Sequence, residues 1–297
     1  MMDWLIANSV TMVNGVALAA VLFIVAIGLS LVFGTMDVLN LAHGSVALIG
    51  AYVGVAVIGG GASNALALVA VLIAAIIGLL AGIALAFLTS SVNDHLRQAM
   101  LTLGVSMIVA DLLLRFFGGD VYAVPPPPFL QGTVPFLFGA QYPLYRLVLI
   151  AVGLVVGIAL WLLLEKTRIG AVVRATVNDR AMVEATGIRT RFVLIGVFGG
   201  GAALAAIGGL LSAPILQAQP GNDNRILLYA LVIVVIGGLG SLKGAAVGAL
   251  VVGQVQTLGV SMIAGYASFL MFAVMALVLL IKPAGLLPSK HGTGGGH

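Results

Sequence analysis

The chain has 297 residues, of which 62% are hydrophobic and 7% are charged, and its formal net charge is +4. Soluble domains carry about 25% charged residues, so this composition excludes a soluble, a nucleic-acid-binding and a disordered protein. The 40 glycines are nearly twice the usual share, and small residues let helices approach closely in lipid. With no cysteine, the chain has no disulfide framework and no thiolate metal site. The composition predicts an all-α fold, a polytopic transmembrane helix bundle.

Long apolar segments alternate with short polar connections along the chain. A crossing needs about 20 apolar residues, which predicts about eight to ten membrane segments in one domain over residues 1–290, followed by a disordered tail at 291–297. The segments at 44–60 and 226–240 are short and adjoin glycine-containing interruptions, so we expect broken or re-entrant helices there. The segments are 10–33, 44–60, 65–89, 100–117, 144–164, 191–214, 226–240, 243–262 and 266–281.

The first polar interruption lies between the first two segments and contains Asp37, Asn40, His43 and Ser45. One interpretation is a helix that unwinds near Asn40 and starts again at Ser45, a good N-cap residue. The free N–H groups of the new helix would then point at an anionic group such as a carboxylate. The other interpretation is a surface loop with His43 bonded to backbone. The apolar residues between the polar ones favour the broken helix.

The distribution of charge predicts the orientation. Residues 165–191 carry six basic and three acidic side chains, whereas residues 118–143 contain one Asp and no Lys or Arg. The positive-inside rule therefore places 165–190 in the cytoplasm and 118–143 outside. Asp111 and Arg115, four residues apart, are expected to pair with each other near the external interface.

The cytoplasmic segment contains a short predicted helix over residues 179–186. Asn178 or Asp179 can cap its start, and Gly187 suits the left-handed position after its end. Such a capped helix, exposed on a loop, suits docking on a soluble partner. The alternative is a solvated loop that only enforces the topology.

The faces of this short helix follow from the four-residue spacing of its side chains. Ala181 and Ala185 form a strip of small residues, with Arg180 and Glu184 as a polar strip beside it. A flat alanine face lets the backbone of a partner come close.

The second interruption is Gly237-Gly238-Leu239-Gly240-Ser241. Both interruptions place a Gly and a Ser just before the next apolar segment, a weak sign of an internal repeat, and repeats with broken helices are typical of transporters. Lys243 follows these glycines, but Gly244 comes after the lysine, so the order of a phosphate-binding loop is absent. The sequence predicts no nucleotide, cofactor or metal site.

Three stretches, 28–45, 174–188 and 237–248, resemble the LivH-type permeases of branched-chain amino-acid ABC importers. A closing Lys282-Pro-Ala-Gly-Leu-Leu287 completes the pattern, which follows the family's order over nearly the whole chain. The resemblance implies a permease domain without catalysis of its own, in the bacterial inner membrane. It implies as partners a LivM-type second permease subunit, two cytoplasmic ABC ATPases and a periplasmic amino-acid-binding protein. Membrane lipid surrounds such a protein, and nucleic acid is not a partner.

The resemblance also implies roles for individual residues. The segment at 165–190 corresponds to the coupling segment whose helix fits a groove on the ATPase. Ser45 stands where many relatives carry a carboxylate, and the family also includes carriers of other amino acids, urea and short amides. The coupling residues carried over are Arg174, Ala175, Asp179, Ala181, Glu184, Ala185 and Gly187. The residues expected along the translocation path are Asp37, Asn40, His43, Ser45, Gly237, Gly238, Gly240 and Ser241.

Two other classes of function compete with this interpretation. A secondary transporter driven by an ion gradient usually needs an intramembrane carboxylate or proton relay, for which only Asp37, Asp111 and His43 are candidates. An intramembrane hydrolase would need a nucleophile and a base, but His43 and Ser45 are too close in sequence and no Gly-x-Ser-x-Gly occurs. Uptake that requires ATP and separate ATPase subunits distinguishes the importer from both.

Overall fold

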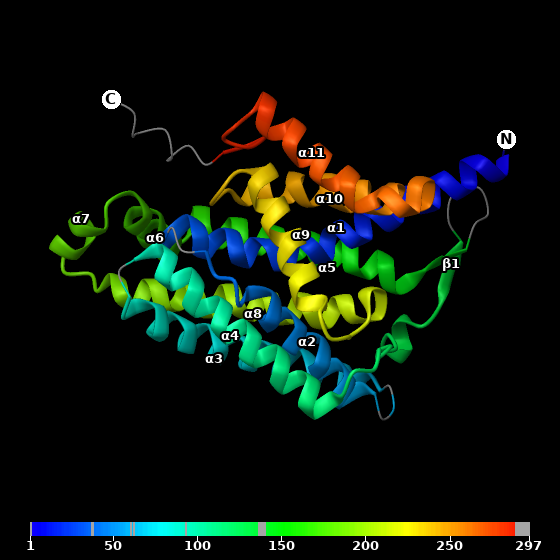
Figure 1. Cartoon of the computed structure of the whole chain (residues 1–297), viewed down its shortest axis with the longest axis horizontal. Helices are drawn as coiled ribbons and strands as arrows, with labels where there is room; N and C mark the ends of the chain where they lie inside the picture. The colour runs from blue at the N-terminus through cyan, green and yellow to red at the C-terminus, as the bar shows by residue number, and fades with distance from the viewer. Residues whose placement is uncertain are drawn as a thin grey trace.

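The computed structural model describes residues 2–36, 39–59, 61, 63–92, 94–135 and 141–288. In these residues almost all regular structure is helical, which confirms the predicted all-α membrane bundle (Figure 1). The helices are α1 (Met2–Met36), α2 (His43–Ile58), α3 (Asn64–Ser90), α4 (His95–Phe117), α5 (Leu144–Lys166), α6 (Arg168–Asn178), α7 (Arg180–Ala185), α8 (Thr190–Leu216), α9 (Asn222–Gly237), α10 (Leu242–Ile263) and α11 (Ala267–Ile281). The shorter elements are the 3-10 turns η1 (Pro128–Leu130) and η3 (Ala264–Tyr266) and the strands β1 (Thr133–Pro135) and β2 (Gln141–Pro143).

Six helices of the described chain are long and apolar enough to cross a membrane, namely those in α1, α3, α4, α5, α8 and α10. The two segments predicted to be short correspond to α2 and α9, which have 16 residues each. At 1.5 Å per residue each is about 24 Å long, less than the hydrocarbon core of about 30 Å. Helix α9 begins at Asn222, four residues before the predicted segment at 226–240, and thereby includes polar residues that lie outside that segment.

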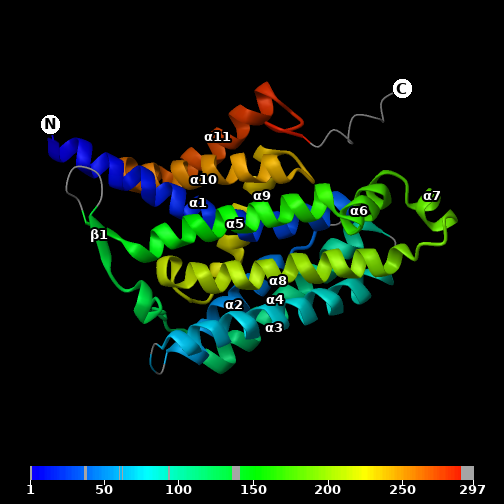
Figure 2. The same ribbon diagram turned by 180° about the vertical axis from the view of Figure 1, so that it is seen from behind.

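The bundle is built around α1 and α8. The hydrophobic part of α1 is 78% buried and that of α8 is 56% buried, against 11% for α4 and for α5. Figures 1 and 2 show α3 and α4 on one side of α8, with α10 and α11 beyond α1 on the other side. Helix α9 crosses the long helices (Figure 1) and links the two sides of the bundle.

Glycines allow the central helices to touch backbone to backbone. A Cβ atom at Gly209 of α8 would lie 1.7 Å from the carbonyl oxygen of Ala47, and one at Gly50 of α2 would lie 1.9 Å from that of Ala206. Real Cβ atoms do not approach so closely, so no larger residue fits without moving a helix. The high glycine content therefore reflects close helix packing in the core.

The two polar ends of the bundle carry different structures (Figure 1). One end has α6 and α7, and the other has the antiparallel hairpin of β1 and β2, which the sequence did not predict. Tyr142 of the hairpin is fully buried and donates its hydroxyl hydrogen to the Oδ1 of Asn14 at 2.9 Å. The hairpin is thus fastened to α1. The expected pair is also present, with the Nε of Arg115 lying 3.9 Å from the Oδ2 of Asp111.

Candidate functional site

The first interruption is a true break between α1 and α2, but the new helix does not start where the sequence predicted. The side-chain Oδ1 of Asn40 accepts the Ala42 N–H at 3.1 Å, and α2 begins at His43. An Asn that bonds two residues ahead turns the chain, so the turn is complete before Ser45 is reached. The prediction of Ser45 as the N-cap is therefore wrong, because Ser45 lies inside the first turn of α2. Asp37 lies outside the residues that the structure describes.

Ser45 belongs to a buried polar cluster made by three helices. Its Oγ lies 2.7 Å from the Oγ of Ser106 on α4 and 3.3 Å from the Oδ2 of Asp223 on α9. A carboxylate only accepts, so Ser45 donates to Asp223 and Ser106 donates to Ser45. All three side chains are at most 5% exposed. Within the described chain, the other carboxylate oxygen of Asp223 has no hydrogen-bond partner.

The cluster lies at half the depth of the bundle. Ser106 is eleven residues from each end of α4. The Nε2 of His43 lies 2.9 Å from the carbonyl oxygen of Val25, which belongs to the central part of α1. The short helices α2 and α9 therefore both begin in the interior, and their first turns meet there: a Cβ on Gly44 would lie 2.2 Å from the carbonyl oxygen of Asp223.

The start of α2, beside this cluster, has unused hydrogen-bond donors. The His43 N–H donates to the Asn40 carbonyl at 3.3 Å and the Val46 N–H donates to the Ala42 carbonyl at 3.0 Å. Among the residues described, neither Gly44 nor Ser45 donates its amide N–H. Such free N–H groups, with the helix dipole behind them, attract negative charge.

A polar stripe on α4 supports the break. The buried residues of α4 are Gln98, Thr102 and Ser106, which are four apart and share one face. The Oγ1 of Thr102 accepts the Leu41 N–H at 3.1 Å, so α4 holds the irregular backbone before α2. This stripe is visible in the sequence as three polar residues at a spacing of four in a largely apolar segment.

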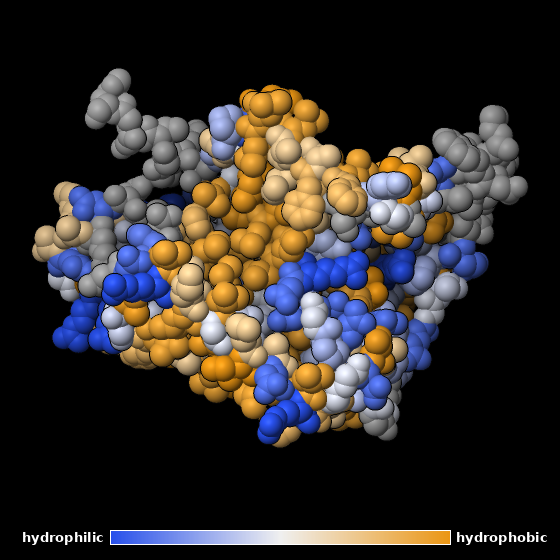
Figure 3. Space-filling view, viewed as in Figure 1, coloured by the Kyte–Doolittle hydropathy of each residue, from blue (hydrophilic) through white to orange (hydrophobic). Residues whose placement is uncertain are grey.

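Asp223 is a further residue that sequence reasoning missed. The sequence indicates Asp37 and Asp111 as intramembrane carboxylate candidates but not Asp223, which lies between the predicted segments 191–214 and 226–240. The sequence signal for an earlier start of this helix is an acidic residue shortly after Gly221, because acidic residues are enriched in the first turn of a helix. Figure 3 shows hydrophilic surface that extends from the middle of this face, where Figure 1 draws the start of α9, toward the hairpin end of the bundle. Arg225 is exposed on this turn and donates its Nε hydrogen to the Tyr229 hydroxyl at 2.9 Å.

The second interruption lies far from this cluster, at the other end of α9. Gly237 is fourteen residues from Asp223, or about 21 Å along the helix. Gly238 and Gly240 have positive φ angles of 103° and 70°, which only glycine adopts easily. The Oγ of Ser241 accepts the Gly244 N–H at 3.0 Å and so caps α10. The structure therefore separates the two groups of residues that the sequence assigned to one path.

The short helix predicted at 179–186 is present as α7. The Oδ1 of Asp179 accepts the Met182 N–H at 2.9 Å, and Gly187 has a φ of 85°, so both predicted caps are confirmed. Ala181 and Ala185 are exposed on α7. Glu184 accepts a hydrogen bond from the Thr190 hydroxyl, which ties α7 to the start of α8.

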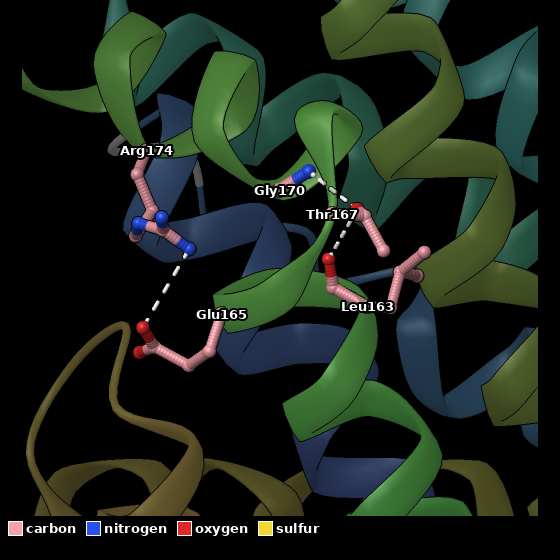
Figure 4. A network of polar contacts seen from close by, with 5 residues as sticks. All are labelled: Leu163, Glu165, Thr167, Gly170 and Arg174. Atoms are coloured by element: carbon pink, nitrogen blue, oxygen red, sulfur yellow. Dashed lines mark hydrogen bonds and ion pairs between the residues drawn. The ribbon is translucent and has the colours of Figure 1, made fainter.

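Helix α6 precedes α7 and was not predicted. Figure 4 shows the bend between α5 and α6: the Thr167 hydroxyl donates to the Leu163 carbonyl at 2.6 Å and accepts the Gly170 N–H at 3.1 Å. The Nη1 of Arg174 points back across the bend and lies 3.8 Å from the Oε2 of Glu165. Arg174 thus faces the end of α5, while Ala175 beside it is exposed.

Comparisons with known proteins agree with this architecture. The sequence matches the family described as "Branched-chain amino acid transport system / permease component" over residues 11–279. It is 26% identical to the high-affinity branched-chain amino acid transport system permease protein BraD of Pseudomonas aeruginosa, over 93% of this chain and 94% of that protein. It is 29% identical to the corresponding permease protein LivH of Salmonella typhimurium, with the same two shares covered. The ribose import permease protein RbsC of Escherichia coli is 26% identical over 87% of this chain and 79% of its own length.

No solved structure is significantly similar to the chain. The match to the family nevertheless extends from the first membrane helix to the last, and it includes both interruptions and the segment with α6 and α7. The chain belongs to the family of permease components of branched-chain amino acid transport systems.

Proposed function

We propose that the chain is the membrane permease subunit of an ATP-driven importer of branched-chain amino acids in a bacterial inner membrane. Family membership and the names of the relatives from Pseudomonas and Salmonella support this assignment. The protein moves its substrate rather than converting it. ATP hydrolysis is the task of separate cytoplasmic ATPase subunits, and a periplasmic binding protein delivers the amino acid.

The observation that carries the proposal is the polar cluster where α2 and α9 begin. An amino acid carries one positive and one negative charge. The free carboxylate oxygen of Asp223 complements an ammonium group, and the free N–H groups of Gly44 and Ser45 complement a carboxylate. A neutral substrate such as urea would leave Asp223 without a cation, so this pattern favours an amino acid.

The other residues of the path act around this cluster. Asn40 fixes the turn that starts α2, and His43 anchors that start to α1. We keep Asp37 in the path, on the segment that leads to Asn40. The turn at 237–241 holds the far end of α9, so that α9 moves as one body when the cluster opens to either side of the membrane.

The segment with α6 and α7 couples this movement to the ATPases. We propose that Ala181 and Ala185 dock on the ATPase surface, with Asp179 and Gly187 fixing the helix ends. Glu184 holds α7 against α8, since it binds Thr190. Arg174 and Ala175 lie on α6, where the contact of Arg174 with Glu165 sets the direction in which α7 projects.

A LivM-type second permease subunit covers the hydrophilic surface at the start of α9. Arg225 is exposed there, near the middle of the bundle, and a charged group at that depth faces protein or water rather than lipid. The pairing of two permease subunits over this surface would enclose the path between them.

Reconstitution tests the proposed function. Proteoliposomes containing the chain with its LivM-type, ATPase and binding-protein partners should accumulate radiolabelled leucine only when ATP is supplied. The buried Asp223 also fits an ion-driven carrier, so the same vesicles are tested with a proton or sodium gradient and no ATP. Leucine accumulation under a gradient alone would show that the chain is a secondary transporter and not part of an ATP-driven importer. A preference for urea over leucine would contradict the proposed amino-acid substrate.

The orientation gives a second prediction, which the absence of native cysteine makes simple to test. Gln131 and Met182 are exposed at opposite ends of the bundle. We expect an impermeant maleimide to label Gln131→Cys on intact cells and Met182→Cys only after the membrane is permeabilised, because the basic segment stays inside. If only Met182→Cys is labelled on intact cells, the orientation of the chain is the opposite of the one proposed.

A further inference from the structure

A cavity of about 710 Å³ lies where α5 ends and α10 begins, next to α6. Among the described residues, three cationic side chains line it, from Lys166, Arg174 and Lys243, against one acidic side chain, Glu165. Glu165 balances only Arg174, at 3.8 Å. The buried Nη1 of Arg174 has no hydrogen-bond acceptor among the described residues. The cavity, called here the cationic pocket, therefore has an excess of positive charge and an unused donor.

An apolar groove of about 550 Å³ lies beside the cationic pocket, between α1, α5 and α10. The two cavities share the lining residues Trp161, Leu242 and Lys243, so they adjoin each other, and together they are called here the depression. The groove follows α5 from Trp161 to Ile150, which is eleven residues or about 16 Å at 1.5 Å per residue. This length matches half of a hydrocarbon core of about 30 Å, the depth of one leaflet.

The groove has the lining expected for a hydrocarbon chain. Its lining contains large apolar residues, among them Phe23, Ile158 and Leu250, and the small residues Ala20 and Gly157. Of the described residues that line it, Lys243 alone is charged, and this residue also lines the cationic pocket. The Nζ of Lys166 lies 5.7 Å from the centre of the Trp161 ring, so cationic and aromatic groups meet at this junction as they do at a membrane interface.

We propose that this depression binds one anionic phospholipid of the leaflet next to α6. The phosphate of its headgroup lies between Lys166, Arg174 and Lys243, and one acyl chain follows the apolar groove. A small soluble anion would use the cationic pocket and leave the groove empty, whereas a phospholipid matches both the charge and the length. Basic pockets between transmembrane helices recognise anionic headgroups in this way. Lipid binding here does not require the proposed transport activity, although Arg174 takes part in both proposals.

The headgroup part is tested by native mass spectrometry of the purified full-length chain titrated with phosphatidylglycerol. Lys166 and Lys243 are exposed, so the double variant Lys166→Gln/Lys243→Gln should fold normally. It should bind phosphatidylglycerol about 25-fold more weakly, at about fivefold for each cation removed. The matched control, Arg189→Gln/Lys282→Gln, removes two exposed cations outside the depression and should change binding less than twofold. Equal weakening in both variants would mean that general surface charge, not this pocket, attracts the lipid.

The acyl-chain part is tested on α5. Ile158→Trp narrows the groove and should displace phosphatidylglycerol, whereas Leu162→Trp, a similarly exposed residue outside the groove, should not. Glycerol phosphate should fail to compete at concentrations at which phosphatidylglycerol saturates the protein, and phosphatidylcholine should bind at least tenfold more weakly. Competition by glycerol phosphate, or unchanged binding to Ile158→Trp, would overturn the lipid assignment.

Discussion

Asp223→Asn is expected to lower leucine uptake about 10- to 100-fold while the protein remains folded in the membrane. The substitution keeps the size of the side chain and an oxygen for the Ser45 hydroxyl, but it removes the negative charge. A hydrogen bond to a charged group contributes about 1.5–3 kcal/mol, and 1.4 kcal/mol corresponds to tenfold in an equilibrium. The loss should appear in the apparent affinity for leucine, because the ammonium group loses its partner.

The measurement is the initial rate of ATP-dependent uptake in proteoliposomes over a range of leucine concentrations. Asp111→Asn is the matched control, since Asp111 also lies on a membrane helix but is exposed and paired with Arg115. The uptake rate of Asp111→Asn should lie within twofold of the rate of the natural protein. If Asp223→Asn transports normally, the cluster of Ser45, Ser106 and Asp223 serves only to join three helices, and the path lies elsewhere.

Much of the architecture follows from local sequence signals. Apolar length predicted the membrane helices, and the shortness of two segments predicted α2 and α9. The caps of α7 were predictable because both depend on local features: Asp179 accepts a hydrogen bond from a residue three positions ahead, and Gly187 adopts a positive φ shortly after the helix. Asn40 was correctly placed at the point where the chain turns, but the start of α2 was misjudged, because an Asn turn and a Ser cap compete within five residues.

The composition of the polar cluster was not predictable in the same way. Ser45, Ser106 and Asp223 come together from three helices, across sequence separations of 61 and 178 residues. The sequence of one helix can show that the helix has a polar face, but it does not show which other helix that face will contact. The two glycine-containing interruptions looked alike in sequence, yet one lies at the start of a half-length helix in the interior and the other is a turn at the end of α9.

Ala181→Trp is expected to abolish leucine uptake and the stimulation of ATP hydrolysis together, with normal expression and membrane insertion. Ala181 is exposed on α7, and its methyl group lets a partner surface approach the helix backbone. An indole would hold the two surfaces apart. Overpacking a tight contact costs about 1–3 kcal/mol, which is about 5- to 150-fold in the affinity of the ATPase for the permease. Folding is unaffected because the side chain points away from the core of this chain.

Three measurements on the assembled importer distinguish docking from topology: co-purification of the ATPase, its hydrolysis rate, and uptake. Ala171→Trp is the control, since it adds the same indole at an exposed position of α6, outside the proposed contact. It should retain all three activities. Glu184→Lys should have an intermediate effect, because it removes the bond to Thr190 that fixes α7 but leaves the alanine face intact. Normal ATPase binding and uptake in Ala181→Trp would mean that the segment at 165–190 only enforces the orientation, because a docked alanine face has no room for an indole.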